Sequence, residues 1–338
     1  MKRSRSDSDN SDSDSDSQIS SASSNKKKKT ADVLANRSKE YWYKDGTVVI
    51  SLERTLYKLY AGRLARCSSY FAQVLQVSEH RSAGYGLVDG VPLHTLKVGV
   101  SATDFNLLLR VVEDGSALAL GSTSLTYTET ASILQASSAL GFDALFQSAK
   151  AAVAARWSSE LEDLAVPVPS SPGGGAAAAL VLAEKYDMPA IRKRCLYELL
   201  RLEDFGCGAP KDAPEPVEAE PELSREHLLA LMRTRQQWQN TLFALLEQPP
   251  MIPARCGTYS CPGERAQDIA VFQRGPLVTR PQLMKQALLD PLHAIELMET
   301  DCARREYCMH CKGERQAWAK EMRTKVWRDM DVWFGTDA

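Results

Sequence analysis

The amino-acid sequence predicts an α+β fold, in which a small mixed sheet flanked by helices is followed by a mainly α-helical extension. The first observation is a β-branched run at 46–51 that is followed, after a turn, by "TLYKLY" at 55–60, which is typical of two paired strands. The second is a change in the spacing of the apolar residues. After the two strands, bulky apolar residues recur at Leu64, Phe71 and Leu75, which is the spacing of one helix face. The third is that the second half of the chain reads as helices separated by Pro-rich stretches.

Residues 1–36 are predicted to be a disordered tail rich in Ser, Asp and Lys, because they contain almost no apolar side chains whose burial could offset the entropy lost on ordering. The tail carries a nuclear-import candidate at Lys26, Lys27, Lys28 and Lys29, with a solvated charged run as the alternative. No apolar run approaches the roughly 18 residues that span a bilayer, and the N-terminus is charged. We therefore expect no membrane association and a nuclear or cytoplasmic location.

Residues 37–160 are predicted to form the folded α/β part of the chain. After the two strands and the helical segment that contains Leu64, a further strand is expected at 93–100. Ser101 then begins an amphipathic helix that carries Asp104 in its first turn. The apolar face of that helix is predicted to contain Phe105, Leu108, Leu109 and Val112. Two more helices follow and are broken near Gly141, so the order is hairpin, helix pair, strand, helix, helix pair.

Composition divides the rest of the chain. Residues 161–176 are predicted to be a Pro/Gly linker, 177–248 a helical extension and 249–338 a Cys-containing helical module. Within the extension, Pro189 suits the first turn of a helix. Ser224 is expected to cap the long helix that follows an acidic, Pro-rich stretch.

Three segments of this sequence have a recognisable order. The first contains Asp45, the "TVVIS" strand and the L-x-x-x-S-x-x-F register of Leu64, Ser68 and Phe71. "LHTLKVGVSATDFNLLLRVVEDG" is the second and "TASILQASSALGFDALFQSAKAAV" the third. Together they resemble the successive segments of a BTB/POZ domain, and the remainder is similar to the helical, Cys-containing C-terminal extension of fungal, basidiomycete-type BTB proteins. One departure is Tyr60, at a position where the family usually has His.

The resemblance implies a BTB/POZ-like fold, protein partners and a homodimer. It further implies one of two roles, either an adaptor that brings a substrate to a cullin-type ubiquitin ligase or a nuclear regulator that acts through dimerisation. Enzymatic activity is not expected, because G-x-S-x-G, G-x-x-x-x-G-K-[ST], H-E-x-x-H and G-x-G-x-x-G are all absent from the sequence. A nucleic-acid-binding regulator that uses the basic tail and the cysteines is the alternative, although the net charge of −2 argues against a general polyanion binder.

Four cysteines near the end of the chain have spacings that suit one structural zinc ion. The candidate ligands are Cys256, Cys261, Cys308 and Cys311. Zinc takes four thiolate or imidazole ligands at tetrahedral corners, and each pair can occupy two corners. The ion would also close the loop before the last helices, which lacks an apolar core of its own. Unliganded thiols and a redox switch are the alternatives, and Cys302 or His310 could replace one ligand.

Overall fold

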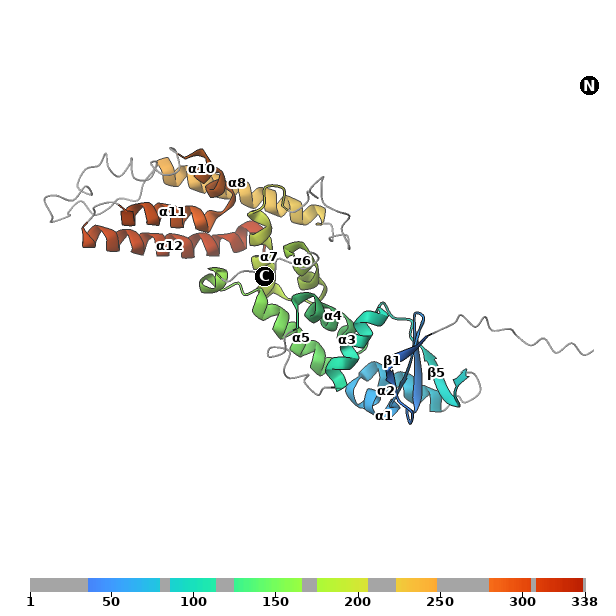
Figure 1. The fold of residues 1–338 in the computed structure, drawn as a ribbon. Coiled ribbons are helices and arrows are strands. Elements are labelled where there is room, and N and C mark those ends of the chain that lie inside the picture. The colour runs from blue at the N-terminus through green and yellow to red at the C-terminus, as the bar shows by residue number, and fades with distance from the viewer. Residues whose placement is uncertain are drawn as a thin grey trace, which may run out of the picture.

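The computed structural model is α+β, with a five-stranded mixed sheet near the N-terminus and a helical region after it (Figure 1). It describes residues 36–79, 86–113, 125–165, 175–205, 223–247, 280–304 and 308–336. The strands are β1 (Asn36–Trp42), β2 (Val48–Leu52), β3 (Thr55–Leu59), β4 (Leu87–Val88) and β5 (Val91–Thr95). The helices are α1 (Ala61–Cys67), α2 (Ser69–Glu79), α3 (Ala102–Glu113), α4 (Tyr127–Ala139), α5 (Asp143–Arg156), the 3-10 helix η2 (Leu161–Ala165), α6 (Ala176–Lys185), α7 (Pro189–Leu200), α8 (Arg225–Glu247), α10 (Pro281–Leu289), α11 (Pro291–Arg304) and α12 (Met309–Phe334). None of the helices in these ranges combines the length and the apolar composition that crossing a bilayer requires.

The strand order in the sheet is β1-β3-β2-β5-β4. β2 and β3 form the predicted antiparallel hairpin, in which Val48 pairs with Leu59. β2 also pairs in parallel with β5, so it is the central strand of the sheet. Val49 and Ile50 are both fully buried although neighbouring residues of a strand point to opposite faces. Burial on both faces explains why this run is continuously apolar instead of alternating.

β1 was not predicted, because its sequence NRSKEYW is polar and lies in and beside the expected tail. Only Tyr41 of this strand is buried. Parallel pairing with β3 therefore makes the segment a strand, in the absence of a strong propensity of its own. The sheet curls, since Arg37 of β1 forms an ion pair at 3.0 Å with Asp89, which lies in the turn between β4 and β5 at the other edge.

The join between the hairpin and the helices contains the L-x-x-x-S-x-x-F register. Ser68 lies between α1 and α2, and its Oγ accepts a hydrogen bond from the backbone N–H of Phe71 at 3.0 Å, which caps α2. The same hydroxyl donates to the carbonyl oxygen of Leu140 at 2.5 Å, at the end of α4. Leu64 and Phe71 are buried in the core. The two apolar residues therefore anchor the helix pair, and the serine fixes it to the turn between α4 and α5.

Two predictions for the α/β part differ from the structure in detail. The strand expected at 93–100 is β5 at Val91–Thr95, because pairing with the short strand β4 begins earlier than the apolar run suggests. In α3, Ser101 accepts from the backbone of the first turn, as predicted. Its buried residues include Val111, whereas Val112 is only partly buried, because α3 packs against α4 as well as against the sheet.

The helical region is more continuous than predicted. The linker expected at 161–176 is shorter, because Leu161–Ala165 form η2 and α6 begins at Ala176. Helices from the regions 177–248 and 249–338 form one bundle, in which α8 packs against α10 and α12, and α11 packs against α12. Figure 1 shows the sheet at one end of an elongated molecule and this bundle at the other, with α5, α6 and α7 between them.

The predicted starts of two helices in this region are confirmed. Pro189 occupies the first turn of α7. Ser224 precedes α8, and its Oγ accepts a hydrogen bond from the backbone N–H of His227 at 3.2 Å. Both are local signals, which explains why they could be read without knowledge of the bundle.

Gly141, in the turn between α4 and α5, is a position where only glycine fits. Its φ angle is 62°, in the left-handed region. Its carbonyl oxygen accepts from the backbone N–H of Ser69 at 2.9 Å, so α2 begins directly against this turn. A Cβ atom here would lie 2.9 Å from the backbone nitrogen of Tyr70 and would overlap the side chain of Ser69.

We expect Gly141→Ala to lower the free energy of unfolding by at least about 2 kcal/mol, because the left-handed conformation and the contact with Tyr70 are both unfavourable for alanine. Urea denaturation followed by circular dichroism would measure the change. Gly62→Ala is the matched control, since this helical glycine has open space around the added methyl and should gain up to about 1 kcal/mol. Equal effects of the two substitutions would contradict the assigned role of Gly141.

Candidate functional site

Helix α7 connects the α/β domain, from β1 to α5, with the helical bundle formed by α8, α10, α11 and α12. It contacts α6, α8 and α12. Cys195, Leu196 and Leu200 are buried, and so are the charged residues Lys193 and Arg194. Helices buried on all sides are usually apolar all round, because an unpaired buried charge is costly. The charged groups of α7 must therefore have partners.

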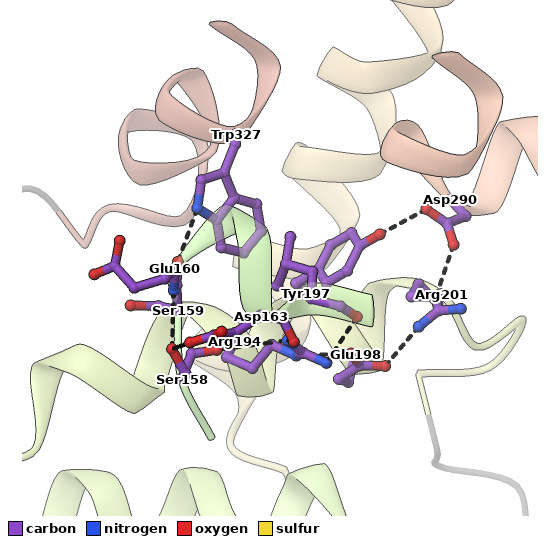
Figure 2. Close-up of polar contacts among 11 residues, drawn as sticks. Ser158, Ser159, Glu160, Asp163, Arg194, Tyr197, Glu198, Arg201, Asp290 and Trp327 are labelled. Carbon is purple, nitrogen blue, oxygen red and sulfur yellow. Dashed lines mark hydrogen bonds and ion pairs between the residues drawn. The ribbon is translucent and has the colours of Figure 1, made fainter. Parts of the chain in front are cut away.

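These partners form a set of polar and aromatic contacts, which we call the α7 junction, and Figure 2 shows the part of it around Arg194, Tyr197 and Arg201. It comprises Ser158, Ser159, Asp163, Leu164, Lys193, Arg194, Tyr197, Glu198, Arg201, Asp290, Trp327 and Asp331. They come from the segment that directly follows α5, from α7, from the turn between α10 and α11, and from α12. The junction is the candidate functional site because it fixes the bundle and the segment after α5 to the same helix.

Arg194 is the centre of the junction, and its side chain is only 3% exposed. Its Nε donates to Oε1 of Glu198 at 2.9 Å, one helical turn later. One terminal nitrogen donates to the carbonyl oxygens of Asp163 at 3.3 Å and Ser158 at 3.5 Å. The other donates to the carbonyl oxygen of Leu164 at 3.3 Å. The planar guanidinium thus ties η2 and the segment before it to α7.

Tyr197 and Arg201 connect the same helix to the bundle. The Tyr197 hydroxyl donates to Oδ1 of Asp290 at 2.7 Å, and Arg201 Nε donates to the other carboxylate oxygen at 2.8 Å. Arg201 also donates to Glu198 at 2.9 Å, so Glu198 joins the two arginines. Asp290 lies between α10 and α11, and its carboxylate accepts from the backbone N–H of His293 at 3.0 Å, which caps α11. Figure 2 shows this chain of contacts running from Arg194 to Asp290.

Trp327 brings α12 to the junction. Its Nε1 donates to the carbonyl oxygen of Ser159 at 3.0 Å, a contact between residues far apart in the sequence. Its ring meets that of Tyr197 edge to face, with centroids 5.3 Å apart. Lys193 places its ammonium 4.3 Å from the Trp327 ring centre and 2.6 Å from the carboxylate of Asp331. The C-terminal helix is therefore held to α7 by an ion pair, a cation–π contact and a ring–ring contact, and to the segment after α5 by the indole hydrogen bond.

The polar groups of the junction hold helices together. Glu198 and Asp290 are each bound by arginine, and Asp290 also accepts from Tyr197, so their oxygens are committed to holding helices. Burial, and after it the charge of Asp290, raises the pKa of Tyr197 well above its usual value, which keeps the hydroxyl a donor. Burial likewise raises the pKa of the Cys195 thiol, which suppresses the reactive thiolate.

The structure covers only part of the site predicted from the sequence. Cys308 is the N-cap residue of α12 and Cys311 is buried in its first turn. Cys256 and Cys261 lie outside the described residues, as do Lys26, Lys27, Lys28 and Lys29. Within the described ranges, no three His, Cys, Asp or Glu side chains gather as metal ligands would. His310 is exposed, and the zinc site stays a prediction.

Sequence reasoning missed the α7 junction. The spacing of Arg194, Glu198 and Arg201 places them along one side of a helix, and this was the only available signal. Such spacing is common on solvated helix faces, where ion pairs contribute little. Nothing local indicates that this side is buried or that Asp290 completes it.

No protein-family model, curated protein or solved structure matches this chain. The likeness to BTB/POZ proteins therefore rests on the order and spacing of the segments alone.

Replacing Arg194 tests the structural weight of the junction. We expect Arg194→Ala to lower the free energy of unfolding by about 3–5 kcal/mol, because the buried carboxylate of Glu198 and several carbonyl oxygens lose their donor. Guanidinium denaturation of the full chain would measure it. Arg233→Ala on α8 is the control, since this arginine is exposed and should change stability by less than about 0.5 kcal/mol. Indistinguishable midpoints for the two variants would refute the role of Arg194.

Metal analysis of the full chain tests the cysteine prediction. About one zinc per chain is expected, and Cys308→Ser should reduce this content because a tetrahedral structural site loses one of its four ligands. Cys67→Ser is the control, because Cys67 is exposed on α1 and is not one of the candidate ligands. A purified chain that is stably folded and metal-free would end the zinc hypothesis.

Proposed function

We propose that this chain is a non-enzymatic protein-interaction module of the BTB/POZ type, which self-associates through its α/β domain. In this proposal it serves either as an adaptor for a cullin-type ubiquitin ligase or in a nuclear regulatory complex. The order of the α/β domain supports the proposal, because a hairpin, a helix pair, a strand, a helix and a second helix pair follow one another as in the family that the sequence resembles. Fold alone does not determine function, so further support comes from the α7 junction and from the surface of the α/β domain.

The observation that carries the proposal is the α7 junction. An adaptor has to hold one protein at a fixed position relative to another, and this requires a stiff connection between two surfaces. Arg194 ties η2 to α7, and Asp290 and Trp327 tie the bundle to the same helix. A short stiff joint of this kind suits an adaptor better than a flexible tether would.

A partly exposed aromatic cluster on the α/β domain adds a second observation. The rings of Tyr43 and Tyr60 stack with centroids 5.1 Å apart, and the Tyr60 hydroxyl donates to Asp45 at 2.7 Å. Arg63 lies in the next turn of the chain and pairs with Glu113. Tyrosine and arginine are enriched at the energetic centres of protein interfaces. The cluster is therefore a candidate contact for the α/β domain.

The proposal is tested by capture of partners with a tagged full-length chain in crosslinked cells. We expect a second, differently tagged copy of the chain to be captured, together with a cullin-type scaffold for the adaptor role. Tyr60→Ala should reduce this capture severalfold, because the stacked pair loses a ring at the surface. Tyr186→Ala is the control for the loss of a tyrosine ring, because this partly buried residue follows α6 and packs on Phe146 of α5, away from the Tyr43–Tyr60 pair.

The outcomes distinguish the two roles. Capture of a scaffold favours the adaptor, whereas self-association without any cullin favours the nuclear regulator. In the second case, changing Lys26, Lys27, Lys28 and Lys29 to alanine should abolish nuclear accumulation of a fluorescent fusion, and changing them to arginine should preserve it. A chain that captures neither itself nor any other protein in stoichiometric amount contradicts the proposed function.

A further inference from the structure

One side of α8 exposes apolar residues along its length. Leu229 is 38% exposed, Met232 59% and Phe243 50%. The opposite side carries Leu231 and Trp238, both fully buried. The indole of Trp238 donates to the carbonyl oxygen of Ala287 at 2.7 Å, so α10 lies on that inner side. The exposed residues therefore face away from the bundle, and Figure 1 shows α8 along its edge.

The exposed residues belong to a regular set, which we call the α8 stripe. It consists of Arg225, Leu229, Met232, Gln236, Phe243 and Glu247, all of them exposed. Arg225, Gln236 and Glu247 are spaced by eleven residues, or three helical turns, so the stripe runs almost straight along the helix. It begins with a positive charge, ends with a negative one and has apolar residues between them.

The α8 stripe is complementary to the same stripe on a second helix that runs in the opposite direction. Leu229 and Phe243 lie seven residues on either side of Gln236, and Arg225 and Glu247 lie eleven residues on either side. If two such helices run antiparallel about Gln236, Leu229 of each meets Phe243 of the other. Arg225 of each then meets Glu247 of the other. Self-complementarity of this kind is what a two-fold symmetric contact requires.

The charges at the two ends of α8 support the same arrangement. The N-terminus of a helix favours negative side chains and its C-terminus favours positive ones. Arg225 and Glu247 have the opposite placement, while Glu226 beside Arg225 has the favourable one. Neither Arg225 nor Glu247 has an ion-pair partner among the described residues. In an antiparallel pair each lies beside the opposite charge of the second helix, which compensates for the unfavourable position.

We propose that the α8 stripe is an interface between two copies of this chain, in which the two α8 helices pack antiparallel about Gln236. The contact is separate from self-association through the α/β domain, because all of its residues belong to the helical bundle. It buries Leu229, Met232 and Phe243 of both copies between two pairs of opposite charges. It goes beyond the proposed function and does not depend on it.

Charge reversal of the full chain tests the proposal by sedimentation equilibrium. We expect Arg225→Glu alone, and Glu247→Arg alone, to raise the dissociation constant of this contact by at least about tenfold, because each brings like charges together. The double variant should restore association to within about threefold of the unchanged chain. Both single substitutions suit the helix dipole better than the native residues, so unfolding of α8 cannot account for weakened association.

Crosslinking provides a second readout that does not depend on the charges. Gln236→Cys places a thiol at the two-fold axis, and mild oxidation should yield a disulfide-linked dimer on a non-reducing denaturing gel. Gln237→Cys is the matched control, because this neighbouring exposed glutamine lies about 100° around the helix and should not crosslink. The unsubstituted chain, with its own eight cysteines, gives the background.

Three outcomes overturn the proposal. One is association that is indifferent to both single reversals. Another is loss in the single variants without restoration in the double variant, which would mean that the α8 stripe meets another segment of the chain and not the same stripe of a second copy. The third is equal crosslinking of Gln236→Cys and Gln237→Cys. Capture of a second copy does not by itself distinguish the two contacts. The Tyr60→Ala effect and cullin capture test the α/β domain, whereas the charge reversals and the Gln236→Cys crosslink test the α8 stripe, so the two proposals fail separately.

Discussion

The burial of one guanidinium group constrains the whole molecule. Arg194 has almost no contact with solvent, and moving its charge out of water is costly unless its N–H groups are satisfied. Glu198 supplies one acceptor from α7 itself, and the remaining acceptors are main-chain carbonyls from 158–164. Those carbonyls are available only if η2 is folded against α7. The fold of a short segment after α5 is thus tied to a residue about thirty positions later, and through Glu198, Arg201 and Asp290 to the bundle beyond it.

How much could be predicted from the sequence depends on the distance over which each feature is determined. The hairpin, the helix cap at Ser101 and the start of α7 at Pro189 are set by neighbouring residues, and each was predicted correctly. β1 could not be predicted, because a polar segment becomes a strand only through its pairing with β3. η2 lies at the start of the range expected as a linker, and its fold could not be predicted because the residues that hold it belong to α7. The α7 junction was missed for the same reason: its charged residues have the spacing of an exposed helix face, and only the folded chain shows them buried.

The two ends of the molecule present different chemistry. The α/β domain offers a compact surface with stacked tyrosines and a neighbouring arginine, where directional polar contacts can select a partner. The bundle offers a long helix with apolar side chains between charged ends, where packing and end charges define orientation. Between them, the polar groups of the α7 junction are occupied with each other. In the two interaction proposals, the ends of the molecule contact other polypeptides and the middle supplies rigidity. Within the α/β domain, Ser68 and Gly141 connect the helix pair α1–α2 to the turn between α4 and α5.

A stiff joint also determines how strongly two bound partners influence each other. With a flexible tether, the local concentration of one partner around the other falls gradually as the tether lengthens. With α7 fixed at Arg194, Asp290 and Trp327, the separation is set by the geometry of folded helices and has little spread. In the proposed adaptor role, partners whose reactive groups match that separation would experience a very high effective molarity, and those that do not match it would experience almost none. Substrate choice in that role would follow from reach and orientation, without any difference in binding affinity.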